Sequence, residues 1–343
     1  MVSRSLRALV VAALFPLTSA VAQSQTIHAT LTRSLPPHSA PGRDVAFSPD
    51  SHILASAGVD SVVKLWSVPD GRLIASLRHP IGVTAIAFSP DGKSLVTGSY
   101  DSIIRIWDVQ TRRVIRSLRG HAGTVWALDV SSNGQLIASG GEDKTVKIWQ
   151  ASDGRLLRTL SGHSLNIWRT VFAPDGESVL SASFDKTARI WRISDGRLIR
   201  TLTGHTQAVV GADISRDGTT IATSGDDSSI RLWRLSDGAF IRAMTGGSQH
   251  IYTVAFSPDS RWLASAGREK SAIGTLWKQI TGNRLKGGNS PTVRLWRVSD
   301  GKLQQAIADN DDDVFAISIS LDGSWMAATS NDGGLKLWRL TAR

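Results

Sequence analysis

Seven tryptophans at a nearly constant spacing constrain the fold of this 343-residue chain more than any other feature. They are separated by 41, 42, 42, 42, 63 and 42 residues and lie at Trp66, Trp107, Trp149, Trp191, Trp233, Trp296 and Trp338. Removing 21 residues from the fifth interval restores one period throughout. A fixed period of this length is typical of a chain built from copies of one supersecondary unit.

Other segments recur in phase with these tryptophans. Each repeat holds four short stretches of apolar or β-branched residues, such as Leu54–Gly58 (LASAG). Pro-Asp-Gly or Ser-Asp-Gly sequences separate them, and such sequences favour tight turns. The pattern therefore predicts four β-strands in every repeat.

The repeats resemble the WD-repeat β-propeller family. The resemblance rests on Gly120-His121, Gly162-His163 and Gly204-His205, each followed by an Asp and then by the repeat tryptophan. Only Asp108 supplies the Asp that gives the family its name. The match covers nearly all of the chain after its first residues. Since one unit cannot bury both faces of its sheet, we expect an all-β, seven-bladed propeller with four-stranded antiparallel blades.

The two ends of the repeat array complement each other. Residues 26–35 resemble the fourth strand of a repeat although no blade precedes them, and the last repeat ends soon after Trp338. We therefore expect the N-terminal strand to complete the last blade. That pairing would close the ring and leave no open sheet edge at the seam.

The first residues have the features of a signal peptide. Arg4 and Arg7 precede an apolar run, and Ala20-Val21-Ala22 fits a cleavage site. We expect residues 1–22 to be a cleaved leader and 26–343 a single propeller domain, periplasmic or secreted from a bacterium. A transit peptide or an uncleaved anchor is the alternative. The absence of cysteine excludes disulfide scaffolds, cysteine-ligated zinc and thiol nucleophiles.

A His, a hydroxyl, an Asp and the tryptophan recur together in five repeats. In the WD-repeat family such residues form a buried hydrogen-bonded set, which implies a structural role and argues against a hydrolase triad. The repeat tryptophans of the other two blades, Trp296 and Trp338, share that structural role. Blades 6 and 7 have Gly247 and Asn310 at the His position, and blade 7 has Ala328 at the hydroxyl position. The five sets are His38, Ser56, Asp60, Trp66; His79, Thr97, Asp101, Trp107; His121, Ser139, Asp143, Trp149; His163, Ser181, Asp185, Trp191; and His205, Thr223, Asp227, Trp233.

Aromatic residues outside the core pattern indicate a partner-binding face. Five residues after the His position stand Trp126, Trp168, Tyr252 and Phe315, and Tyr100 and Phe184 precede the turn Asp of their repeats. In similar propellers the first of these positions opens onto the mouth of the central channel, and the second lies on the same face. Simple strand alternation would instead bury Trp126 beside Leu128, unless a β-bulge reverses it.

An insert of 21 residues, at about 270–290, interrupts blade 6. It carries a charge of +4 and no acid, and an acidic run at Asp309–Asp313 follows it. We expect the acidic run to dock the insert; a calcium site is the weaker alternative, and neither a metal site nor a cofactor is predicted. The partner-binding candidates in and beside the insert are Arg268, Lys270, Trp277, Lys278, Arg284 and Lys286.

The net charge of +10 does not indicate nucleic-acid binding. Many basic residues keep a fixed place in each repeat, so they are distributed around the ring and form no phosphate-tracking stripe. The chain lacks phosphate-loop, HExxH and nucleophile-elbow motifs. We therefore expect a monomeric, non-enzymatic scaffold that is not transmembrane and binds a protein or peptide on the face with the Gly-His loops. Two alternatives remain: a lactonase-like or sugar-processing enzyme using Glu142, Asp226 or the acidic run, and a binder of anionic envelope polymer or lipid through the insert.

Overall fold

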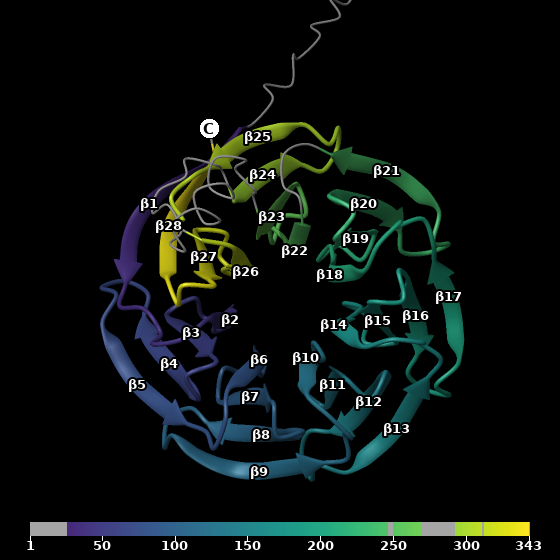
Figure 1. The fold of residues 1–343 in the computed structure, drawn as a ribbon, viewed down its shortest axis with the longest axis horizontal. Helices are drawn as coiled ribbons and strands as arrows, with labels where there is room; N and C mark the ends of the chain where they lie inside the picture. Colours follow the sequence, from purple (N-terminus) through teal and green to yellow (C-terminus); the bar gives the residue numbers. More distant parts are fainter. Residues whose placement is uncertain (1–25, 246–249, 269–291, 311, 343) are drawn as a thin grey trace, which may run out of the picture.

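The computed structural model describes residues 26–245, 250–268, 292–310 and 312–342. They form seven four-stranded antiparallel sheets arranged as blades around a central axis, as Figure 1 shows. The predicted seven-bladed propeller is thereby confirmed. The proposed leader and the insert lie outside the described residues. Within those residues, no helix is long and apolar enough to cross a membrane.

Each blade runs from an innermost strand at the axis to an outermost strand at the rim. The first three blades are β2 (Gly42–Phe47), β3 (Ile53–Gly58), β4 (Val62–Ser67), β5 (Leu73–Arg78); β6 (Val83–Phe88), β7 (Ser94–Ser99), β8 (Ile103–Asp108), β9 (Arg113–Arg119); and β10 (Val125–Val130), β11 (Leu136–Gly141), β12 (Thr145–Gln150), β13 (Leu156–Ser161). Blades 4 and 5 are β14 (Ile167–Phe172), β15 (Ser178–Ser183), β16 (Ala188–Arg192), β17 (Leu198–Leu202); and β18 (Val209–Ile214), β19 (Thr220–Gly225), β20 (Ser229–Arg234), β21 (Phe240–Thr245). Blades 6 and 7 are β22 (His250–Phe256), β23 (Trp262–Arg268), β24 (Val293–Arg297), β25 (Leu303–Ile307); and β26 (Val314–Ile319), β27 (Trp325–Ser330), β28 (Leu335–Ala342), β1 (Ile27–Leu35).

The N-terminal strand closes the ring as predicted. β1 pairs antiparallel with β28, from Ile27 opposite Ala342 to Leu35 opposite Leu335. The fourth strand of blade 7 therefore comes from the opposite end of the chain, and β1 is its outermost strand (Figure 1). Unfolding of either terminus would break the same sheet.

The core lies between neighbouring blades. The repeat tryptophans supply its largest side chains, and Trp66, Trp149 and Trp338 are almost fully buried. Trp149 of blade 3 packs with Val96 and Ile106 of blade 2. The second strands are buried on both faces, where small residues such as Ala138 let the sheets approach. Each blade therefore depends on its neighbours for burial.

A β-bulge occurs at the same place in every innermost strand. In blade 3 the pairing with β11 passes from Val125 to Ala127 and leaves Trp126 as the extra residue. A bulge adds one unpaired residue and changes the direction of the strand, so simple alternation fails there. Trp126 is accordingly half-buried rather than part of the core. The seven bulge residues are Arg43, Thr84, Trp126, Trp168, Val210, Tyr252 and Phe315.

Candidate functional site

The seven bulge residues surround one cavity at the centre of the ring. Its volume is about 250 Å³. The rest of the lining includes Phe184, Asp226 and the residues that follow several bulges, among them Asp44 and Arg169. The bulges are therefore the local feature that brings one side chain from every blade to the same site.

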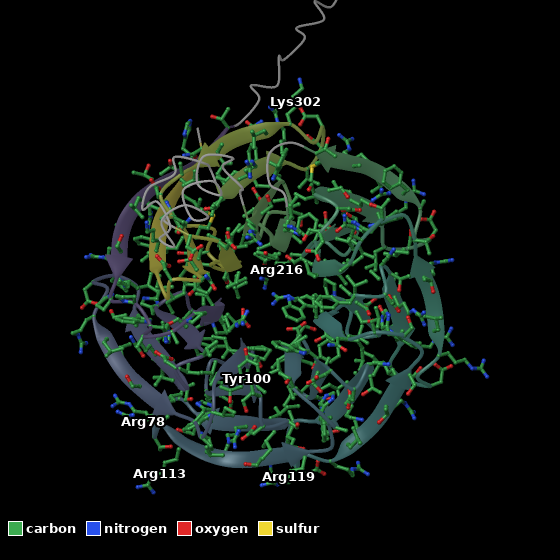
Figure 2. All side chains as sticks on the ribbon, in the orientation of Figure 1. Arg78, Tyr100, Arg113, Arg119, Arg216 and Lys302 are labelled. Carbon is green, nitrogen blue, oxygen red and sulfur yellow. The ribbon has the colours of Figure 1, made fainter. Side chains whose placement is uncertain are left out.

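One wall of this cavity is a stack of three aromatic rings. Trp126 and Trp168 lie with their ring centroids 4.5 Å apart and their planes 21° from parallel. Phe184 continues the stack, 5.0 Å from Trp168. Tyr100 meets Trp126 edge-on at 5.5 Å, and Figure 2 shows Tyr100 beside the central opening. Four of the predicted partner-binding residues thus form one continuous surface.

The opposite wall combines aromatic rings with a cation. Tyr252 and Phe315 are 5.3 Å apart between ring centroids. The guanidinium of Arg43 lies 4.9 Å above the Phe315 ring. His250 stacks on Tyr252 at 6.1 Å, and its Nδ1 lies 3.1 Å from the Asp226 carboxylate. Arg43 is absent from the predicted binding residues, although its position in the repeat is the same as that of Trp126.

A charged pair links the innermost strands of two blades that are not neighbours. Arg169 of blade 4 lies 3.9 Å from the carboxylate of Asp44 in blade 1. Asp44 is buried, and it accepts hydrogen bonds from the backbone N–H groups of Val45 at 2.9 Å and Ile86 at 2.8 Å. Burial raises the pKa of Asp44 above its ordinary value. Because Ile86 belongs to blade 2, the carboxylate also ties two innermost strands together.

Two further carboxylates make the same link between blades. Asp129 accepts the N–H of Phe172 in blade 4, and Asp213 accepts the N–H of Phe256 in blade 6, both at 2.7 Å. Burial raises the pKa of each to about 6. Sequence reasoning missed both residues. The available signal was an acid at an innermost-strand position where other repeats have Ala46, Ala87 or Ala255.

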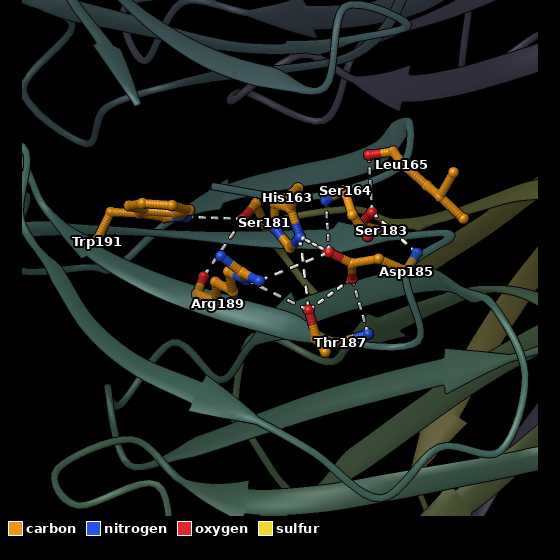
Figure 3. Close-up of polar contacts among 9 residues, drawn as sticks. All are labelled: His163, Ser164, Leu165, Ser181, Ser183, Asp185, Thr187, Arg189 and Trp191. Carbon is orange, nitrogen blue, oxygen red and sulfur yellow. Dashed lines mark hydrogen bonds and ion pairs between the residues drawn. The ribbon is translucent and has the colours of Figure 1, made fainter. Parts of the chain in front are cut away.

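The recurring His residues lie inside the blades and do not line the cavity. Figure 3 shows the set of blade 4, in which Ser181 Oγ receives the indole N–H of Trp191 at 2.8 Å. His163 contacts Ser181 through Nε2 at 2.8 Å and Asp185 through Nδ1 at 2.7 Å. Both ring nitrogens are thereby occupied. Corresponding contacts occur in blades 1, 3 and 5.

Comparison with protein-family models agrees with this architecture. The model described as "WD domain, G-beta repeat" matches residues 29–67, 69–108, 112–150, 154–192, 196–234, 238–273 and 301–339. The chain belongs to the WD40 repeat family. No curated protein sequence matches it at a significant level. Every matched segment begins in, or up to four residues before, the outermost strand of one blade and extends into the next blade, so sequence repeat and blade are out of step by one strand.

Blade 2 departs from the WD40 hydrogen-bonded set and corrects the expectation for His79 and Asp101. His79 Nε2 still contacts Thr97, but its Nδ1 lies 3.2 Å from the carbonyl of Leu77. Asp101 instead forms a 2.6 Å ion pair with Arg105. The cause is Pro80: in blades 1, 3, 4 and 5 the residue after the His donates its N–H to the Asp, and proline has no N–H to donate.

Blades 6 and 7 keep their tryptophans bonded with fewer of the usual partners. Trp296 donates to Ser265 at 2.8 Å, so it is the blade-6 tryptophan. In blade 7, where Ala328 offers no hydroxyl, the carboxylate of Asp309 accepts the indole N–H of Trp338 at 2.8 Å. One member of the acidic run thus has a structural contact that the sequence pattern did not predict.

The rest of the acidic run contacts nearby described residues. Asp312 accepts a hydrogen bond from the side chain of Asn331 at 3.0 Å, and Asp313 lies 3.5 Å from Arg268. Arg268 also interacts with the phenol of Tyr252, which joins it to the aromatic wall. Within the described ranges, no three metal-ligating side chains gather closely enough to hold a metal ion. The docking of the run on the insert stays a prediction, because Asp311 and the insert candidates Lys270, Trp277, Lys278, Arg284 and Lys286 lie outside the described residues.

Proposed function

We propose that this WD40 propeller is an exported, non-enzymatic scaffold that binds a protein or peptide at the mouth of its channel. The observation that carries the proposal is the cavity of about 250 Å³ between two aromatic walls. Aromatic side chains give large contact areas at a low cost in conformational entropy, and they are enriched where binding energy concentrates. Propellers of this family commonly serve as protein-interaction scaffolds.

The polar groups around the cavity favour binding over catalysis. The recurring His side chains are buried inside the blades, and the carboxylate of Asp44 is occupied by two backbone donors. An enzyme at the channel mouth is the alternative, and the contact between Asp226 and His250 is the observation in its favour. A hydrolytic activity that is lost in Asp226→Asn but retained in Trp168→Ala would support that alternative.

A capture experiment with matched variants tests the proposal. Wild type, Trp168→Ala and Phe240→Ala are immobilised and exposed to an envelope extract, and the bound proteins are identified by mass spectrometry. Phe240 is the control because it is an exposed aromatic on the outermost strand β21, at the rim. The proposal predicts a protein that wild type and Phe240→Ala retain and Trp168→Ala loses. Equal capture by all three contradicts it.

Deletion of residues 270–290 distinguishes the third hypothesis, which assigns binding to the basic insert. Binding of an anionic polymer or lipid through these residues would weaken steeply with added salt, because exposed charges are screened. It would also disappear in the deletion variant. Binding that persists in the deletion variant and survives added salt supports the channel mouth instead.

A further inference from the structure

Two of the residues that line the cavity carry hydrogen-bond donors without a partner in the described part of the chain. Arg43 has no hydrogen-bond or ion-pair partner among the described residues, and its guanidinium contacts the face of the Phe315 ring instead. Its Nε is buried and unpaired. The indole N–H of Trp126 is likewise buried without a partner in the described part of the chain. Both residues line the cavity.

The two carboxylates that line the same cavity already have partners. Asp44 holds two backbone N–H groups and faces Arg169, and Asp226 faces His250. The hydroxyl of Thr84 donates to the carbonyl of Gly98 at 3.0 Å. Of the charged side chains that line the cavity, Asp44, Arg169 and Asp226 thus each face an ionisable partner among the described residues, and Arg43 faces none. A partly buried cation without a counter-charge gains free energy when an anion pairs with it.

The size of the cavity limits what can enter. At about 250 Å³ it is smaller than the roughly 300–1,000 Å³ of pockets that hold drug-sized ligands. One side chain fits this space while its own backbone stays outside, on the face of the ring. The stacked rings of Trp126 and Trp168 suit an apolar stem, and the guanidinium of Arg43 suits an anion at its end.

We propose that the cavity receives one acidic side chain of the partner, an Asp or Glu, whose carboxylate binds Arg43. This inference rests on the proposed function, because it names the chemistry of the partner at that site. A carboxylate matches the planar guanidinium and supplies the counter-charge that Arg43 lacks among the described residues. Because Arg43 is half-buried, the pair is less screened by water than an ion pair on the open surface, which strengthens it.

Small probes with one change of charge test the ligand chemistry. Wild type is titrated with 3-phenylpropionate, with its neutral amide and with 3-phenylpropylamine, while NMR follows the indole N–H resonance of Trp126. That resonance is assigned with Trp126→Phe. We expect the carboxylate to bind about tenfold or more tightly than the amide, the size of one charge-assisted hydrogen bond. Equal or tighter binding of the amide or the amine overturns the inference, as does the absence of carboxylate binding at millimolar concentration.

Variants then assign the effect to the side chain. Arg43→Gln should remove the preference for the carboxylate, and Arg43→Lys should keep part of it because a point charge remains. Arg113→Gln is the control, since Arg113 is exposed at the rim (Figure 2). Thermal unfolding shows that each variant is folded; if Arg43→Gln unfolds, Arg43→Lys carries the comparison. An unchanged preference in the folded Arg43 variants overturns the assignment.

Two acetylated peptides separate the sources of the carboxylate. One is acetyl-Gly-Phe-Glu-Gly-amide, and the other ends in a free carboxylate after Phe and has no acidic side chain. The inference predicts binding of the first; exclusive binding of the second overturns it. A captured protein that Trp168→Ala loses and Arg43→Gln retains at full strength would leave the proposed function standing and defeat this inference alone.

Discussion

Trp126 and Trp168 stack with their ring centroids 4.5 Å apart, and each is the bulge residue of its innermost strand. The two rings come from adjacent blades, so their contact spans the joint between blades 3 and 4. A bulge at one register position in all seven blades turns a core-forming strand into a row of side chains around a cavity. The repeat thereby fixes where the site lies, while the residue chosen at each bulge decides its chemistry.

The stacked pair and the repeat tryptophans should respond differently to truncation. Trp149→Ala leaves a large void in the core and should lower the free energy of unfolding by about 3–5 kcal/mol. Trp168→Ala removes a half-buried ring from a cavity wall and should cost markedly less. Urea unfolding of both variants measures the difference. Equal losses would mean that Trp168 is a core residue.

Asp309 should stabilise blade 7 because Ala328 has no hydroxyl to accept the indole N–H of Trp338. Asp309→Ala leaves the buried indole N–H of Trp338 without an acceptor and should cost about 1–3 kcal/mol of unfolding free energy. Adding Ala328→Ser should restore part of that loss, because Ser supplies the acceptor found in other blades. The double variant is compared with Asp309→Ala by urea unfolding. No recovery would show that the carboxylate does more than accept this bond.

His79 should make the protein less stable as the pH falls from 6.5 towards 4. Burial lowers the pKa of His79 to about 4 from the ordinary value of 6.5, so the unfolded chain takes up the proton first. Its contribution to stability is complete above pH 6.5 and declines below it. His79→Asn should therefore flatten the pH dependence of the unfolding free energy in that interval. An unchanged slope would contradict the lowered pKa.

Asp129 should make the protein less stable as the pH rises, whereas His79 makes it less stable as the pH falls. Because burial raises its pKa from 3.8 to about 6, the folded state holds the proton more tightly than the unfolded chain does. Its contribution to stability is complete below pH 3.8 and is lost as the pH rises through about 6. Asp129→Asn costs the N–H bond from Phe172 or Val130 at every pH but should remove this decline. Unfolding free energies measured at several pH values between 4 and 7 test it, and a decline as steep as that of wild type would be inconsistent with the raised pKa.

The sequence was sufficient for the architecture because the features that determine it repeat. The tryptophan period predicts the number of blades, and residues 26–35 predict the ring closure that pairs β1 with β28. The side chains at the mouth of the channel were harder to predict from the sequence, since strand alternation alone would bury Trp126. Only the shift in pairing between Val125 and Ala127 shows that Trp126 is a bulge residue and leaves the core.

Exceptions to the repeat were less predictable than the repeat itself. The departure in blade 2 could be predicted from Pro80, because proline has no N–H to donate to Asp101. The bond from Trp338 to Asp309 had no such signal, since it replaces a hydroxyl from the same sheet with a carboxylate from the preceding loop. The unpaired state of Arg43 depends on its surroundings in three dimensions, which a repeat position does not report.

The affinity of the purified captured partner for wild type, Trp168→Ala and Phe240→Ala tests the central claim most directly. If the channel mouth is the binding surface, Trp168→Ala should raise Kd by about 30-fold or more, as expected for an aromatic hot spot worth about 2 kcal/mol. Phe240→Ala should leave Kd unchanged. A Kd for Trp168→Ala equal to that of wild type, with the variant folded, would contradict the account.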